Sequence, residues 1–147
     1  MKAIKIYLDN CCHNRPFDSQ TNMKIRFETE AKLYIQNCIL EGEYNLCWSF
    51  VLDYENGNNP FEDKRNIISS WKKIAKDFCY PNEAIRSRGK ELMNLGIKEL
   101  DALHIACAME KQCDYFITVD RGLLNKNVDG LKIINPIDFI RKVGDQL

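Results

Sequence analysis

Residues 99–120 read ELDALHIACAMEKQCDYFITVD, and this stretch decides the fold class of the chain. Its first part is apolar almost all round beyond Asp101, which predicts a buried helix over Lys98–Lys111. Its second part predicts a short strand over Tyr115–Val119 that ends at Asp120. A buried helix followed at once by a strand is typical of α/β proteins, in which the two kinds of element alternate.

The same alternation continues along the rest of the chain. Further strands are predicted at Ala3–Leu8, Tyr44–Trp48 and Leu131–Ile134. Helices are predicted over Asn22–Glu41, from a Ser49 cap through Glu55, and over Phe61–Phe78, Pro81–Leu95 and Pro136–Lys142, with a loop over Asn10–Thr21. The helix over Phe61–Phe78 is expected to face the core with its apolar side, which consists of Ile67, Ile68, Trp71, Ile74, Ala75 and Phe78. Because short strands separated by helices pair in parallel, we expect a three-layer α/β/α sandwich around a small parallel sheet of four or five strands.

The composition is that of an ordinary globular chain. It has 147 residues, 45% of them hydrophobic, with 21 basic and 21 acidic side chains. This length suits one domain over residues 1–147. Balanced charge argues against a diffuse nucleic-acid binder, but not against a local cleft that handles phosphates through a bound metal. Met1–Asp9 lacks the form of a signal peptide, and no apolar run approaches the roughly 18–20 residues that span a bilayer, so we expect a cytoplasmic protein without a membrane partner.

The seven cysteines do not form a metal or disulfide pattern. Their number is odd, their spacing is irregular and no C-x-x-C occurs, which disfavours both a secreted disulfide framework and a zinc ribbon. We expect buried, reduced thiols that pack as small apolar side chains. Cys11, Cys12 and His13 form the one local cluster, and adjacent cysteines rarely share a metal.

Four acids fall at the ends of predicted elements, on one side of the predicted sheet. Asp9 and Asp120 each close a strand, Asp101 opens the most apolar helix, and Glu55 ends the short helix after the second strand. Ligands of open α/β sheets bind outside the carboxyl ends of the strands, so these side chains are expected to converge. Two like charges ~4 Å apart repel by about 4 kcal/mol at an effective dielectric near 20. Protons or divalent cations must relieve that repulsion.

Mg²⁺ and Mn²⁺ are the cations that this set of ligands favours. Both prefer oxygen ligands and are usually held by a few carboxylates together with substrate phosphate. Such ions lower the pKa of bound water, orient it for attack and neutralise charge on a departing oxygen, which is the chemistry of nucleases and phosphatases.

Taken alone, each acid also has an ordinary explanation. Asp9 and Asp120 would serve as turn residues at strand ends, and Asp101 as a helix N-terminal residue favoured by the dipole. Glu55 would be a solvated helix residue, with Asp53 as the alternative ligand if Glu55 points away. The argument for a site comes from the four acids as a set.

At these residues the chain resembles the PIN-domain family, which includes the VapC-type ribonuclease toxins of toxin–antitoxin pairs. The resemblance rests on the order of Asp9, Ser49 to Glu55, DALHIA at 101–106 and TVD at 118–120. It runs from Ile4 to the last predicted strand. It implies an α/β/α fold, divalent-metal RNA endonuclease activity, and an acidic metal site at Asp9, Glu55, Asp101 and Asp120.

The same resemblance implies accessory residues and partners. Thr118 matches a hydroxyl that would orient a carboxylate or water, Asn10 would assist by hydrogen bonding, and Ser49 matches a small polar residue that would also cap a helix. Products with 5′-phosphate and 3′-hydroxyl ends, an RNA substrate, a cognate antitoxin and a homodimer are implied too. The segments Asn10–Asp18 and Asn56–Asp63 depart from the common pattern of the family.

Several alternatives remain open from the residues alone. His104 shares a helix face with Asp101 and would either hydrogen-bond a carboxylate or pack in the core. His13 is expected to be a solvated loop residue, and Arg15 would contact phosphate or clamp the loop onto Asp18. A catalytically inactive PIN-like module that binds RNA or a protein, and a phosphatase on a similar sheet, are the competing functions. A Rossmann cofactor site is disfavoured because no G-x-G-x-x-G follows the first strand.

Overall fold

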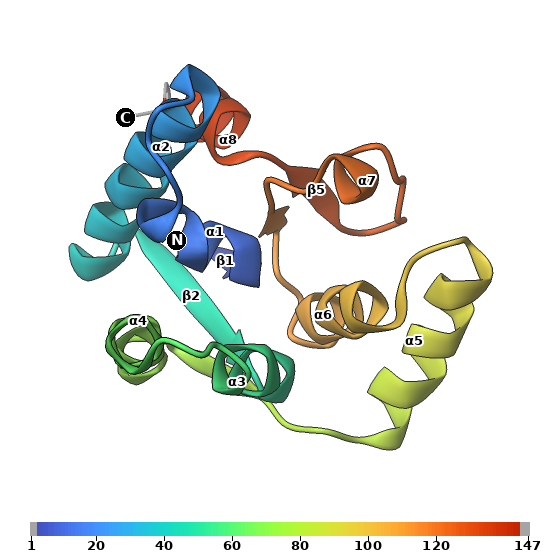
Figure 1. Ribbon diagram of the computed structural model, residues 1–147. Coiled ribbons are helices and arrows are strands. Elements are labelled where there is room, and N and C mark those ends of the chain that lie inside the picture. The colour runs from blue at the N-terminus through green and yellow to red at the C-terminus, as the bar shows by residue number, and fades with distance from the viewer. Residues whose placement is uncertain (1–2, 145–147) are drawn as a thin grey trace.

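A five-stranded sheet forms the middle layer of the computed structural model, which describes residues 3–144 (Figure 1). Neighbouring strands run parallel throughout, in the order β3-β2-β1-β4-β5. The strands are β1 (Ile4–Leu8), β2 (Tyr44–Ser49), β3 (Asp77–Cys79), β4 (Tyr115–Ile117) and β5 (Lys132–Ile134). Helices flank this sheet, which confirms the predicted α/β/α sandwich.

The helices form the two outer layers. They are α1 (Asn10–Asn14), α2 (Met23–Leu40), α3 (Phe50–Gly57), α4 (Glu62–Ser69), α5 (Glu83–Asn94), α6 (Glu99–Glu110), α7 (Arg121–Leu124) and α8 (Pro136–Val143), with 3₁₀ turns η1 (Arg15–Phe17) and η2 (Ser70–Lys73). α2 packs against α8, α5 packs against α6, and the two pairs lie on opposite sides of the strands in Figure 1. Between residues 3 and 144, no helix is both long enough and apolar enough to cross a membrane.

Polar side chains fix where several helices begin. Asn22, Ser49, Asn82 and Asn135 each precede a helix, and the side-chain oxygen of each accepts a backbone N–H of the first turn. These N–H groups have no partner inside the helix, and each such cap stabilises by about 0.5–2 kcal/mol. The capping role predicted for Ser49 is therefore confirmed.

The central strand β1 is buried on both faces, as a parallel strand between two helical layers must be. Ile6, Tyr7 and Leu8 have no exposed surface. The ring of Tyr7 stacks on that of Phe116 in β4, with centroids 5.2 Å apart and planes 12° apart. All seven cysteines are free thiols, and all but Cys11 are buried, as predicted.

The loop predicted over Asn10–Thr21 is wrong. α1 begins immediately after Asp9, whose carboxylate accepts the Asn10 backbone N–H, and η1 follows at once. Pro16 lies early in η1, where its missing N–H costs nothing. The segment is short and polar, so hydrophobic periodicity could not reveal it.

The helix predicted over Phe61–Phe78 is also wrong. α4 ends at Ser69, η2 follows, and Phe78 lies in β3, which pairs with β2 at the edge of the sheet. Ile67, expected to point inward, is 53% exposed. A short apolar run fits a strand as well as a helix, which explains the error. α7, a single turn after β4, was missed altogether.

The core packing gives a first testable prediction. Phe116→Ala should lower the free energy of unfolding by about 3–5 kcal/mol, because it removes a fully buried ring that stacks on Tyr7. Phe27→Ala is the matched control, since that ring is 54% exposed, and should change the value by less than about 0.5 kcal/mol. Chemical denaturation measures both. Equal effects of the two variants would contradict the described core.

Candidate metal centre

Asp9 lies at the carboxyl end of the central strand, where β1 passes into α1. Its backbone N–H donates to the Ile117 carbonyl over 2.9 Å. Its carboxylate accepts hydrogen bonds of 2.8 Å from the Asn10 backbone N–H and from the Thr118 hydroxyl. The residue is only 5% exposed. Asp9 is therefore a buried carboxylate held in one orientation by β1, α1 and the end of β4.

Glu55 and His104 reach the same place from α3 and α6. His104 Nε2 contacts Glu55 Oε1 directly and lies 3.9 Å from Asp9 Oδ1. One donor atom from each of Asp9, Glu55 and His104 lies within 4.8 Å of the other two. Across residues 3–144, this is the one group of three or more His, Cys, Asp or Glu side chains close enough to hold an ion together.

A buried chain of hydroxyl groups supports the His104 ring from behind. Tyr7 Oη lies 2.5 Å from His104 Nδ1 and 2.6 Å from Ser49 Oγ, and Ser49 Oγ accepts the Leu52 backbone N–H. Burial raises the pKa of Tyr7 well above its ordinary value, so the phenol keeps its proton.

The direction of this chain follows from counting protons. A neutral imidazole carries one proton, on either Nδ1 or Nε2. A proton on Nδ1 would leave the lone pair of Nε2 facing the Glu55 carboxylate, and the two would repel each other. The opposite direction satisfies every group: Ser49 donates to Tyr7, Tyr7 donates to His104 Nδ1, and His104 Nε2–H donates to Glu55. In that arrangement His104 is a hydrogen-bond donor that orients Glu55, although its position alone would suit a ligand.

Asp101 and Asp120 are not members of the group formed by Asp9, Glu55 and His104, but they lie near it. Asp101 is half-buried in the first turn of α6, and its pKa is raised to about 6. Burial is the largest cause, followed by the charges of Asp9 and Asp120; Glu55 adds to the shift and His104 opposes it. Asp101 therefore lies within electrostatic range of all three other predicted acids.

Asp120 is exposed and caps α7. Its Oδ1 accepts the Gly122 backbone N–H over 2.8 Å, and its own N–H donates to the Thr118 hydroxyl over 3.1 Å. Thr118 thus connects the two strand-end acids, because the same hydroxyl donates to Asp9. This connection matches the orienting role predicted for Thr118.

The other predicted residues occupy distinct positions. Asn10 Nδ2 donates to Glu55 Oε2 over a long 3.4 Å. Ser49 contacts Tyr7 rather than an acid. Asp53, the alternative to Glu55, points elsewhere, because it accepts the Trp48 indole N–H and pairs with Lys72.

Two predictions about the first loop are corrected or resolved. His13 is fully buried in α1, with its ring 5.0 Å from that of Trp48, so a solvated histidine was wrong. Burial, with the charge of Lys32, lowers the pKa of His13 to about 3. Arg15 pairs with Asp18 and with the buried Glu28, which resolves its role as a clamp.

Sequence reasoning missed the buried partners of the acids. Tyr7 was treated only as a strand residue, and Cys11, whose Sγ lies 3.4 Å from Asp9 Oδ2, was treated only as a thiol. The signal for Tyr7 was a hydroxyl between the apolar residues Ile6 and Leu8 of the central strand, where it must find a buried partner. The sequence left two alternatives for His104, a carboxylate partner or packing in the core, and its spacing from Asp101 did not indicate Glu55 as the partner.

Comparison with known proteins supports the fold. No protein-family model and no curated protein sequence matches the chain. Among solved structures, the chain is similar to one in the crystal structure of FitAcB from Neisseria gonorrhoeae, with a TM-score of 0.56 and 16% sequence identity. The alignment covers 89% of this chain and 97% of that chain. At this identity the similarity concerns the arrangement of helices and strands alone.

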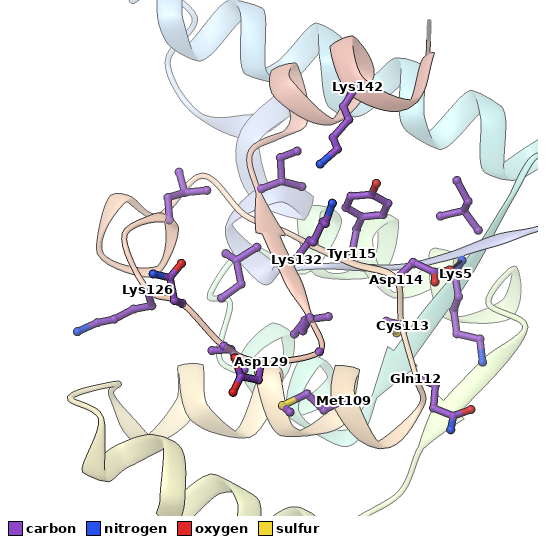
Figure 2. Close-up of a pocket in the computed structure, with 18 of the residues that line it drawn as sticks. Lys5, Met109, Gln112, Cys113, Asp114, Tyr115, Lys126, Asp129, Lys132 and Lys142 are labelled. Carbon is purple, nitrogen blue, oxygen red and sulfur yellow. Dashed lines mark hydrogen bonds between the residues drawn. The ribbon is translucent and has the colours of Figure 1, made fainter. Parts of the chain in front are cut away.

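A more spacious hollow lies at the other end of the sheet. It encloses about 1570 Å³ and is lined at the amino ends of β4 and β5 by Tyr115 and Lys132 (Figure 2). Lys132 and Lys142 extend toward each other on one side of it, and their proximity lowers the pKa of Lys142. None of the four predicted acids lines this hollow, so cavity size does not mark the acidic site.

The crowding of Asp101 makes a prediction about pH and stability. Because folding raises its pKa from 3.8 to about 6, the folded protein binds this proton more tightly than the unfolded chain does. The free energy of unfolding should therefore fall as pH rises from about 4 to about 6. In chelator at pH 7, Asp101→Asn should be more stable than wild type by about 1 kcal/mol, allowing for solvent screening at a half-buried site.

Chemical denaturation at several pH values measures this effect. Asp129→Asn, in an exposed loop, is the control and should follow wild type at every pH. Mn²⁺ should stabilise wild type more than Asp101→Asn. A variant less stable than wild type in chelator at pH 7 would contradict the electrostatic assignment.

The hydroxyl chain makes a separate prediction. Tyr7→Phe should lower the free energy of unfolding by about 1–3 kcal/mol, because Ser49 and His104 Nδ1 lose a buried partner. Tyr44→Phe is the control, since Tyr44 is a buried residue whose hydroxyl makes no hydrogen bond to residues 3–144, and the change should cost under about 0.5 kcal/mol. Nitrogen NMR of the wild type should show the His104 proton on Nε2, facing Glu55, and a lone pair on Nδ1; a proton on Nδ1 would refute the deduced direction.

Proposed function

We propose that the protein is a PIN-like RNA endonuclease that depends on Mg²⁺ or Mn²⁺ held by Asp9, Glu55, Asp101 and Asp120. One observation carries the proposal: carboxylates from β1 and α3 meet at the carboxyl end of the central strand. This edge is where open α/β sheets bind ligands. The fold agrees with the resemblance of the sequence to PIN domains.

The donor set fits a hard divalent cation. The side chains of Asp9 and Glu55 offer carboxylate oxygens within 4.8 Å of each other, and Mg²⁺ and Mn²⁺ prefer such ligands. The raised pKa of Asp101 has burial as its largest cause, followed by the negative charges of Asp9 and Asp120, and a bound cation would oppose both effects. When bound, the ion supplies the positive charge that phosphodiester hydrolysis needs at the attacking and leaving oxygens.

The side chains of the chain itself position the ligands. The Thr118 hydroxyl holds one oxygen of Asp9, and His104 Nε2–H holds Glu55. Asp101 is largely ionised at pH 7, because its pKa of about 6 lies below that pH. Asn10 bridges toward Glu55 at the open side of the site. Such supporting contacts fix ligand orientation and are worth about 10–100-fold in metal affinity or activity.

The substrate and partners follow from the sequence resemblance. We propose an RNA substrate cleaved to 5′-phosphate and 3′-hydroxyl ends, in the cytoplasm, within a single domain. As in VapC-type toxins, a cognate antitoxin would cover the acidic site and quench it, and the chain would form a homodimer.

The decisive experiment is cleavage of RNA by purified protein. Single-stranded and structured RNA should be cut with Mn²⁺ and left intact in chelator. Asp9→Asn, Glu55→Gln and Asp101→Asn should each lower kcat by at least about 100-fold, since each removes a carboxylate proposed to hold the ion that stabilises the reacting phosphate. Asp53→Asn is the matched control on α3, because Asp53 pairs with Lys72 away from the site.

The outcomes separate the competing functions. Cleavage that survives both chelator and Asp101→Asn would refute the mechanism. RNA binding without cleavage, unchanged by acid-to-amide substitution, would indicate an inactive binding module. Hydrolysis of p-nitrophenyl phosphate with RNA left whole would indicate a phosphatase.

A further inference from the structure

A shallow groove of about 310 Å³ lies directly beside the candidate metal centre. It shares Asn10 and Glu55 with that centre and continues along the segment after α3 to Phe61 and Lys64. We propose that this groove holds one base of single-stranded RNA, next to the phosphate that is cut. The inference rests on the proposed function and adds the residues that select the substrate.

The far end of the groove offers an aromatic face and a positive charge together. The Phe61 ring is 57% exposed, and Lys64 Nζ lies 4.2 Å from its centroid and 5.8 Å from that of Phe17. Bases stack on exposed rings with a gain of about 1–3 kcal/mol each. An ammonium group beside the ring can meet the phosphate of the same nucleotide. Phe61 contributes little to the core because more than half of its surface is exposed, and stacking on a base would be its role in the groove.

The near end and floor of the groove are lined by amides. Asn10 lines the groove with unused hydrogen-bonding capacity, because its Oδ1 is buried with no partner among residues 3–144 and its Nδ2 makes only the long contact to Glu55. Asn58 is exposed, and its side chain makes no hydrogen bond to the described residues. An amide carries a donor and an acceptor side by side, which matches the hydrogen-bonding edge of a base.

The rest of the groove is rigid. Asn59 accepts the Phe61 backbone N–H, donates to Asn14, and its carbonyl accepts a hydrogen bond from Arg65. These contacts tie the segment after α3 to α1 and α4. A groove that already exists binds at a smaller entropic cost than one that must form.

Size and charge restrict the occupant to one nucleotide of an unpaired strand. The volume lies at the lower limit of the roughly 300–1000 Å³ found for small-ligand pockets. A duplex presents its bases stacked and paired, so only a single strand could turn a base into this space. The acids nearby are already engaged, since Asp18 pairs with Arg15 and Glu55 with His104.

The test compares kinetics and base preference on short single-stranded RNAs that differ at one position beside the cut. Phe61→Ala should raise KM about tenfold, equivalent to about 1.4 kcal/mol, with kcat within about threefold, and should weaken the base preference. Phe61→Tyr should restore both. Phe27→Ala, an equally exposed phenyl on α2, is the control and should change neither.

A binding measurement keeps this inference distinguishable from the proposed function. Fluorescence anisotropy of a labelled five-nucleotide RNA in chelator should show weaker binding by Phe61→Ala and Lys64→Ala than by Phe27→Ala. Cleavage with unchanged KM and base preference in Phe61→Ala and Lys64→Ala would overturn the groove assignment and leave the endonuclease intact. RNA binding that depends on Phe61 without any cleavage would support the groove assignment and refute the endonuclease. If wild type neither cleaves RNA nor binds it in a way that depends on Phe61, both proposals are refuted.

Discussion

Repulsion among the carboxylates at the end of the central strand is the constraint on which this site depends. The fold reduces this repulsion by placing three of the acids at the starts of helices, where backbone N–H groups lack partners within the helix. Asp9 precedes α1, Asp120 precedes α7, and Asp101 lies in the first turn of α6. Unpaired N–H groups at helix starts stabilise negative charge. The compensation is incomplete at Asp101, whose pKa stays raised by burial and by the charges of Asp9 and Asp120, and the cation proposed for this site would lower that pKa.

The buried hydroxyl chain makes the position of Glu55 depend on several elements of the fold. Tyr7 comes from β1, Ser49 from the end of β2, and His104 from α6, and together they aim one N–H at Glu55 on α3. A fully satisfied buried network specifies one arrangement, whereas a partly satisfied one is costly. Glu55 therefore takes its place from three elements besides its own, which is why a residue on a short helix can act with a strand-end acid.

The features that follow from hydrophobic periodicity and sheet topology could be predicted from the sequence. Strand-end acids such as Asp9 and Asp120 could be located because the carboxyl ends of parallel strands share one edge. Prediction failed where a choice depends on long-range pairing: β3 was interpreted as part of a helix because only its contact with β2 makes it a strand. The partner of His104 was equally unreadable, because helix spacing pointed to Asp101 while packing selected Glu55.

The proposed site has two parts: acids that would hold a cation and a groove that would recognise a substrate. The acids lie at element ends fixed by the sheet, and they agree with the PIN pattern. The segments Asn10–Asp18 and Asn56–Asp63 depart from that pattern, and both line the groove beside Glu55. Surface side chains of these segments can change with little effect on the core, to which only Cys12 and His13 of the first segment belong, whereas moving a strand end would displace a proposed ligand. Variation confined to these segments would therefore alter which RNA is held without altering the chemistry proposed for it, since Glu55 connects the two parts.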